Sequence, residues 1–210
     1  MFVSRRASLR EVIVAKDKSV QLENFAGRWK IGVLTSLHEA LLKRYFGHID
    51  PVLIKDPIVD PLALLASDQI DGMMLPQATV DRLGMSAYVT QRGNPHTFPP
   101  ALGRGLSLAF GGEDTLWGTQ IRNAMHRRTE EIAWACEKQF AQLVPQTLRP
   151  YLFGVASVIG DSISMRGGWM NPDKQEMLQT EVSISELKPQ MCAQMLADKL
   201  QSIEQAQGPV

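Results

Sequence analysis

The sequence predicts an α/β fold, in which a mixed-sheet domain is followed by a small α+β domain of three antiparallel strands and a helix. In the first half, apolar runs of strand length alternate with helical segments, which favours a parallel or mixed sheet covered by helices. In the last third, three strand-like runs precede one helical segment. A chain of 210 residues, of which 44% are hydrophobic, can bury a core of this size.

Five short apolar runs in the first half predict strands, namely residues 11–15, 30–35, 52–55, 72–76 and 87–91. Helices are predicted between them at residues 37–46, 61–67 and 77–85. Asp60 is suited to cap the second helix, because its carboxylate can accept hydrogen bonds from the first amide groups. Pro61 has no amide hydrogen to lose and suits the first helical position, while Gly84 suits the end of the third helix.

A loop and a long helix are predicted in the middle of the chain. Residues 91–105 contain three prolines and three glycines, which indicates a loop or crossover. LSLAF (106–110) alternates as one strand. Residues 115–144 are predicted to form a single helix that ends at Pro145, because an apolar stripe runs along them through Cys136 and Phe140.

The last third predicts a small antiparallel sheet and a helix. Its strand-like runs are LFGVASVIG, SISMRGGWM and EMLQTEVSI. Gly160-Asp161 and Asn171-Pro172-Asp173 separate these runs, and both segments consist of residues that favour turns. Pro189 is suited to begin the final helix.

Composition and charge argue against several classes of protein. Lys plus Arg and Asp plus Glu both total 22, so the formal net charge is zero, which argues against binding nucleic acid through phosphate contacts. No apolar run approaches the roughly 20 residues that cross a bilayer, and residues 1–19 lack the apolar stretch of a secretory signal. Cys136 and Cys192 are far apart in the sequence and are expected to be free thiols of a cytoplasmic protein.

Residue spacing by itself predicts no reaction. The four histidines share no ligand spacing with the cysteines, so no metal site is expected. Ser36 and His38 are close in sequence, but no nucleophile elbow surrounds them. Gly103-Arg104-Gly105 precedes a strand, whereas a phosphate-binding loop precedes a helix.

Several stretches, in the same order, resemble those of hydroxymethylbilane synthases (porphobilinogen deaminases). Residues 71–85, DGMMLPQATVDRLGM, resemble the family's Asp-Ala-Ile-Val-Leu-Ala-Ala-Ala-Gly-Leu-x-Arg-Leu-Gly-Leu. Residues 98–110, FPPALGRGLSLAF, are similar to Pro-Ala-Val-Gly-Gln-Gly-Ala-Leu-x-Ile-Glu, with Arg104 in place of the glutamine. Residues 160–178 resemble two strands of the family's third domain and their turn. The spacing of the family's helix with His and Ala-Glu-Arg-x-Phe is matched by His126, Glu137, Lys138 and Phe140.

These enzymes link four porphobilinogen units into a linear tetrapyrrole, on the route to porphyrins and heme. The resemblance implies that residues 1–111 form a periplasmic-binding-protein-like domain related to the family's second domain with its crossover. It further implies a long connecting helix over residues 112–148 and a third domain over residues 149–210. The chain is expected to be an N-terminally truncated, degenerate member, without the Lys-Asp-Val-Pro segment that carries the family's catalytic aspartate.

The chain departs from the family at the positions that attach and hold its cofactor. The family attaches a dipyrromethane through a cysteine eight residues after the helix phenylalanine, where this sequence has Leu148. The family's Ser-Ser-Leu-Arg-Arg, whose arginines hold cofactor carboxylates, is Thr35-Ser36-Leu37-His38-Glu39 here, and a glutamate repels carboxylates. The arginine of Leu-Arg-Gly-Asn-Val becomes Lys55, which keeps the charge but loses the bidentate geometry.

No catalytic residue and no cofactor are therefore expected, and the candidates for ligand binding are Thr35, Ser36, Lys55 and Arg104. Three functions stay open. The chain is a pseudoenzyme that acts as a binding or partner protein, a partial synthase completed by another chain, or a small-ligand module of periplasmic-binding type. A small anion is the expected kind of ligand.

A homodimer or a partner chain that supplies the first domain is expected as well. LSLAF (106–110) would have lost part of its sheet, and unpaired strand edges bind other chains unless they are covered. The apolar stripe of the helix 115–144 would also lose burial. The alternative is that EVIVA (11–15) or a neighbouring loop folds over this edge.

Overall fold

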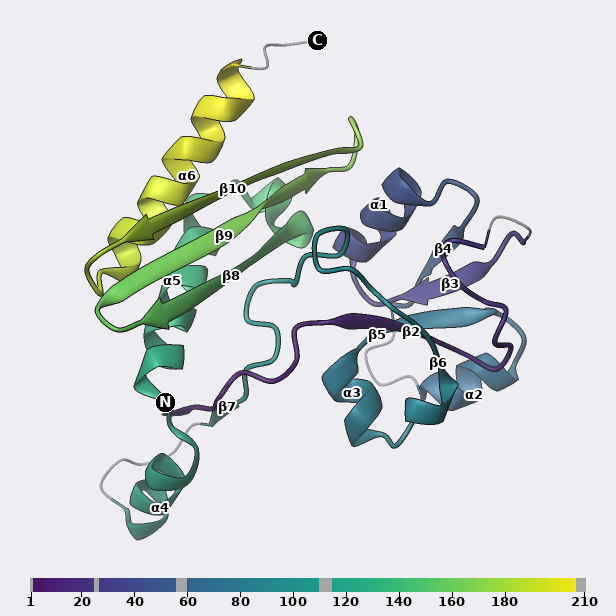
Figure 1. The fold of residues 1–210 in the computed structure, drawn as a ribbon, viewed down its shortest axis with the longest axis horizontal. Helices are drawn as coiled ribbons and strands as arrows, with labels where there is room; N and C mark the ends of the chain where they lie inside the picture. Colours follow the sequence, from purple (N-terminus) through teal and green to yellow (C-terminus); the bar gives the residue numbers. More distant parts are fainter. Residues whose placement is uncertain (1, 25–26, 56–59, 110–114, 207–210) are drawn as a thin grey trace. The chain divides into compact units, whose positions relative to one another are not determined.

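A computed structural model describes residues 2–24, 27–55, 60–109 and 115–206 (Figure 1). The chain forms two compact units, each described here by itself. Unit 1 comprises Met1–Ala7, Ala101–Trp169 and Leu178–Val210, and unit 2 comprises Ser8–Pro100 and Met170–Met177. The predicted fold class is confirmed, since a five-stranded mixed sheet is followed by a three-stranded antiparallel sheet with a C-terminal helix.

Unit 2 is built on the mixed sheet, whose strand order is β4-β3-β5-β2-β6. Strand β3 runs parallel to both β4 and β5, whereas β2 is antiparallel to its neighbours β5 and β6. All residues of β2 and β5 are buried, which explains why these two strands are apolar runs in the sequence, apart from Glu11 at the start of β2. The strands are β2 (Glu11–Ala15), β3 (Lys30–Val33), β4 (Asp50–Leu53), β5 (Gly72–Pro76) and β6 (Val89–Arg92).

The helices of unit 2 agree closely with the expected ones, and they are α1 (Ser36–Tyr45), α2 (Pro61–Ala66) and α3 (Gln77–Arg82). Asp60 caps α2 as predicted, because its Oδ1 accepts a hydrogen bond of 2.9 Å from the Leu62 amide. Gly84 follows α3 with φ +67°, a conformation that favours glycine. Two strands differ from their predicted bounds. The strand predicted at residues 52–55 is β4, which ends at Leu53, and the strand predicted at residues 87–91 is β6, which begins only after a 3-10 turn over Ser86–Tyr88.

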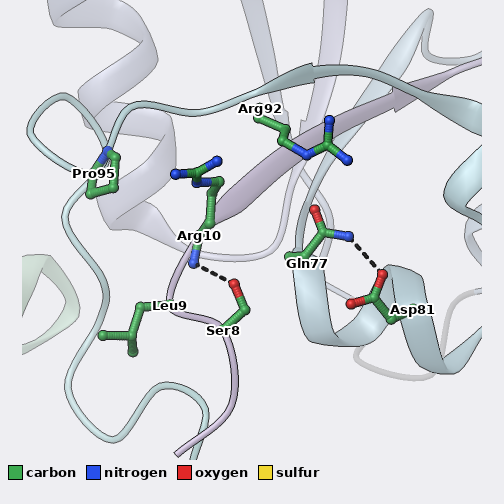
Figure 2. Close-up of a pocket in the computed structure, with 7 residues that line it drawn as sticks. All are labelled: Ser8, Leu9, Arg10, Gln77, Asp81, Arg92 and Pro95. Atoms are coloured by element: carbon green, nitrogen blue, oxygen red, sulfur yellow. Dashed lines mark hydrogen bonds between the residues drawn. The ribbon is translucent and has the colours of Figure 1, made fainter.

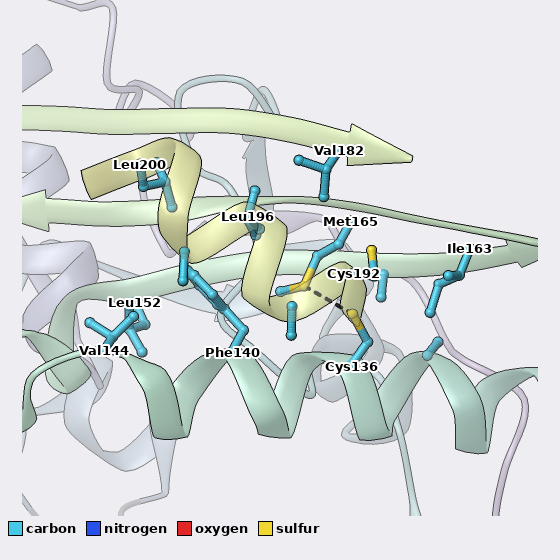
Figure 3. Packing of buried hydrophobic residues seen from close by; sticks show 14 of the residues in the cluster. Cys136, Phe140, Val144, Leu152, Ile163, Met165, Val182, Cys192, Leu196 and Leu200 are labelled. Atoms are coloured by element: carbon cyan, nitrogen blue, oxygen red, sulfur yellow. Dashed lines mark hydrogen bonds between the residues drawn. The ribbon is translucent and has the colours of Figure 1, made fainter. Parts of the chain in front are cut away.

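The antiparallel sheet β10-β9-β8 belongs to unit 1 except for Met170–Met177, and it is covered by α5 (Arg128–Leu143) and α6 (Pro189–Ala206). Figure 3 shows the core between them, where Phe140 of α5, Leu196 of α6 and Met165 of β9 meet. The predicted turn after β9 is confirmed, since Asn171 Oδ1 accepts hydrogen bonds from the two amides that close it. The strands are β8 (Leu152–Ile159), β9 (Ser162–Asn171) and β10 (Glu176–Ile184).

The prediction of one helix over residues 115–144 was wrong. The structure has two helices, α4 (Leu116–Met125) and α5, with His126 and Arg127 extended between them. Strand β1 (Phe2–Val3) explains the break: the Val3 amide donates to His126 Nδ1 at 3.3 Å, and the Arg127 amide donates to the Val3 carbonyl at 2.8 Å. Helical periodicity cannot reveal a break that is made by residues more than a hundred positions away.

Strand β7 (Leu108–Ala109) lies within the predicted strand 106–110, of which Phe110 is outside the described residues. It pairs antiparallel with β1, in the register Phe2↔Ala109 and Val3↔Leu108. EVIVA (11–15), the segment considered as a cover for this edge, is instead the inner strand β2 of unit 2. No helix among the described residues has the length and apolar character needed to span a membrane.

Candidate functional site

The carboxyl ends of the parallel strands of unit 2 lie at one edge of its sheet. Val33 at the end of β3 pairs with Leu53 at the end of β4. Thr35 and Lys55 each follow two residues later, so the structure brings Thr35, Ser36 and Lys55 to the same edge. Sheets of this kind ordinarily bind ligands in the crevice outside the carboxyl ends of their strands.

Helix α1 begins at this edge and presents its first amide groups there. Thr35 is the N-cap, and its hydroxyl oxygen accepts a hydrogen bond of 3.2 Å from the His38 amide. The half-buried Ser36 is the first helical residue. The positive end of a helix attracts anions, and the exposed Lys55 adds a full charge at the end of the neighbouring strand.

The two positions that follow Leu37 in the motif have partners within the chain. His38 and Glu11 are both 2% exposed, and His38 Nε2 lies 3.6 Å from Glu11 Oε1. Glu11 begins β2 opposite Pro76, the last residue of β5, so this pair lies at the same edge of the sheet. Glu39 pairs with Lys43 one turn further along α1, at 2.7 Å. These residues therefore face side chains of their own chain.

Arg104 belongs to unit 1, where it lies in a turn. Its amide donates a hydrogen bond of 3.1 Å to the Ala101 carbonyl, and its own carbonyl accepts a hydrogen bond of 3.0 Å from Arg6 Nη1. Gly103 and Gly105 on either side have φ angles of +73° and +79°, which favour glycine. Arg104 belongs to unit 1 and the other candidates belong to unit 2, and the role of Arg104 in ligand binding stays a prediction.

Sequence reasoning missed a buried ion pair in unit 1. Glu137 is 0% exposed, and its Oε1 accepts hydrogen bonds from Arg6 Nη2 at 2.6 Å and from the Ala156 amide at 2.9 Å. Its Oε2 accepts a hydrogen bond of 2.6 Å from the Gly103 amide. Burial raises the pKa of the Glu137 carboxyl, and Arg6 and the two amides oppose that rise. The sequence signal is the place of Glu137 on the face of α5 that carries Phe140.

Leu148, which the resemblance aligns with the family's cofactor cysteine, lies in the 3-10 segment Gln146–Tyr151 of unit 1. Leu148 is partly buried there and packs against the hydrophobic core. Leucine has no nucleophilic atom. Cys136 and Cys192 are both 0% exposed, and Cys136 Sγ lies 3.5 Å from Met165 Sδ. The neighbouring Cys192 thiol and burial raise the pKa of the Cys136 thiol, which makes Cys136 a poor nucleophile.

The chain is an α/β protein with a mixed sheet, and proteins of this class ordinarily hold small ligands at the carboxyl ends of their parallel strands. The family described as "Porphobilinogen deaminase, dipyromethane cofactor binding domain" matches residues 1–110, just over half of the chain. The chain belongs to the porphobilinogen deaminase family.

Two relatives place the chain among distant members. The porphobilinogen deaminase of Desulfosudis oleivorans is 22% identical over 171 residues, covering 80% of this chain and 55% of the relative. That of Macrococcus caseolyticus is 25% identical over 172 residues, covering 81% of this chain and 56% of the relative. The chain therefore spans about half the length of the curated relatives it matches.

The residues present do not fit the dipyrromethane that the family's description names. A thioether needs a reactive thiol, and Leu148 stands at the expected position. The positions of the two motif arginines hold a buried histidine beside Glu11 and a glutamate paired with Lys43. Neither position supplies the arginine fork that binds a carboxylate, and the glutamate disfavours the carboxylates of such a cofactor. Within the described residues, no group of three or more His, Cys, Asp or Glu side chains could hold a metal ion.

Proposed function

We propose that this chain is a porphobilinogen deaminase-like protein that carries no covalent dipyrromethane and has no deaminase activity by itself. It acts in the cytoplasm, in the context of tetrapyrrole biosynthesis, as a protein that binds a small anionic ligand. The observation that carries the proposal concerns His38 and Glu39, which stand where the resemblance places the two arginines that hold cofactor carboxylates. His38 pairs with Glu11 and Glu39 pairs with Lys43, so both side chains contact residues of their own chain. Leu148 in place of the cysteine supports it.

The ligand site of this proposal is the edge that carries Thr35, Ser36 and Lys55. Amide groups of the first turn of α1 and the Lys55 ammonium supply positive potential without a fixed bidentate geometry. Such a site suits reversible binding of one carboxylate or phosphate group. The experiment that tests the proposed function is an assay with porphobilinogen, in which the chain alone should form no linear tetrapyrrole.

A second candidate function, a partial synthase completed by another polypeptide, is favoured by the surface of α4. Leu116 and Trp117 are each 73% exposed on this helix, and Leu108 of β7 is 40% exposed in the same unit. Large apolar side chains exposed together are typical of interaction sites. In this proposal the α4 surface binds a chain that carries further parts of a deaminase, and in the absence of that chain it binds a second copy of the same chain.

Light scattering measures this association. At micromolar concentration we expect the mass of a dimer for the wild-type chain and the mass of a monomer for Trp117→Lys, because a charge at the centre of an apolar interface is costly to bury. Ile159→Lys is the matched control, since Ile159 is a single apolar residue at the end of β8 and is 79% exposed. A wild-type monomer, or equal loss of association in both variants, would contradict self-association through α4.

A further inference from the structure

A polar pocket opens at the same edge of the unit 2 sheet, where β5 and β6 end and β2 begins. Its volume is about 430 Å³, and Arg10, Arg92, Gln77 and Asp81 line it (Figure 2). Arg10 and Arg92 lie outside the family motifs described above, whereas Gln77 and Asp81 lie within residues 71–85 but coincide with no fixed residue of that motif. Strand β5 separates this pocket from β3 and β4, which carry Thr35 and Lys55, so the inference does not rest on the proposed ligand site.

The register of the sheet places the two arginines close together. Arg92 pairs with Val12, and Arg10 lies two residues before Val12 on the neighbouring strand. The pairing persists at this end, because the Gly93 amide donates to the Glu11 carbonyl at 2.8 Å. Side chains at diagonal positions on one face of antiparallel strands ordinarily lie about 7–8 Å apart. One small molecule can therefore reach both guanidinium groups.

The charges in the pocket are not balanced by the protein. In the described part of the chain, neither Arg10 nor Arg92 makes an ion pair. Asp81 is the acidic residue among those that line the pocket, and its Oδ1 accepts a hydrogen bond of 2.6 Å from Gln77 Nε2. Two arginines and one aspartate therefore give the pocket a positive charge, which attracts anions.

We infer that this pocket binds the carboxylate or phosphate group of a small molecule between Arg10 and Arg92. The planar fork of each guanidinium matches two oxygens of such a group, and bonds between two charged partners are the strongest hydrogen bonds. Asp81 repels a second negative group on the side of α3. The anionic end of the ligand therefore lies against the arginines, and its uncharged or cationic part lies against Asp81 and Gln77.

Isothermal titration of the full chain at low ionic strength, with inorganic phosphate and with succinate as probes, tests this inference. We expect saturable binding of at least one probe, which weakens as salt is added. Arg10→Gln and Arg92→Gln should each weaken it about tenfold or more, because each removes hydrogen bonds between two charged partners. Asp81→Asn should strengthen binding, because it removes a like charge from the pocket.

The matched control is Arg28→Gln, which removes the same charge near the amino ends of β3 and β4, where Arg28 lines a different pocket. It should leave binding unchanged. Stronger binding of phosphate identifies a phosphate ligand, and stronger binding of succinate identifies a carboxylate. Absence of saturable binding of both probes, or equal loss in Arg28→Gln, overturns the inference, provided that circular dichroism shows each variant folded. Turnover of porphobilinogen would refute the proposed function and leave this result unaffected.

Discussion

Purified protein given porphobilinogen is expected to release no hydroxymethylbilane above the uncatalysed background. Leu148 offers no nucleophile for a covalent cofactor, and Glu39 and the His38–Glu11 pair put acidic groups where the family holds carboxylates. Without the bound cofactor, the family's reaction has no primer to extend. We therefore expect this chain to have no deaminase activity at all, rather than a lower rate than that of other members of the family.

Leu148→Cys is the informative variant for this assay. It supplies a thiol in the segment Gln146–Tyr151 but leaves His38 against Glu11 and Glu39 against Lys43, so it should not restore turnover. The deaminase of Macrococcus caseolyticus, assayed in parallel, shows that the substrate and the detection work. Product formation by the wild-type chain would mean that its reaction centre lies elsewhere and would contradict the proposed function.

The largest loss of stability is expected from Glu137→Gln. This change removes the closer of two charged partners of the largely buried Arg6 side chain, because Glu130 stays 3.4 Å from Arg6 Nε. Breaking a buried ion pair by removing one member costs at most about 3–5 kcal/mol. The carboxylate also joins segments that are distant in sequence, because it accepts hydrogen bonds from the amides of Gly103 and Ala156. The free energy of unfolding of unit 1, measured in urea, should fall by that amount.

Two further variants separate this effect from a general sensitivity to substitution. Glu39→Gln breaks the exposed pair with Lys43 and should cost less than about 1 kcal/mol. The double variant Arg6→Met/Glu137→Met should regain part of the loss, because no unpaired charge is left in the interior. A free energy of unfolding for Glu137→Gln within about 1 kcal/mol of the wild-type value would show that the pair contributes little.

The sequence predicts those parts of the fold that depend on short-range patterns. The central strands β2 and β5 were predicted with their correct bounds, because strands covered on both faces are continuous apolar runs. The cap of α2 was predicted from Asp60 and Pro61, because capping is a local interaction. The resemblance to the family rested on ordered motifs and was confirmed by the match over residues 1–110.

The remaining features depend on contacts between distant residues. The break between α4 and α5 is set by Val3, and the partner of Glu137 is Arg6, at a separation of 131 residues. The pairing of His38 with Glu11 likewise joins the first turn of α1 to the start of β2. Periodicity and motif spacing carry no information on pairs of distant residues. The contact between His38 and Glu11 is therefore seen only in the structure.

The mass of the intact chain, purified from cells that produce porphobilinogen, tests the central claim most directly. The claim is that this member of the family carries no covalent cofactor, because its sequence has Leu148 in the anchor position and its two cysteines are buried. We expect the mass of the unmodified polypeptide, with the Macrococcus caseolyticus deaminase prepared in the same way as a control. An increment that matches a dipyrromethane, mapped to Cys136 or Cys192, would contradict the claim.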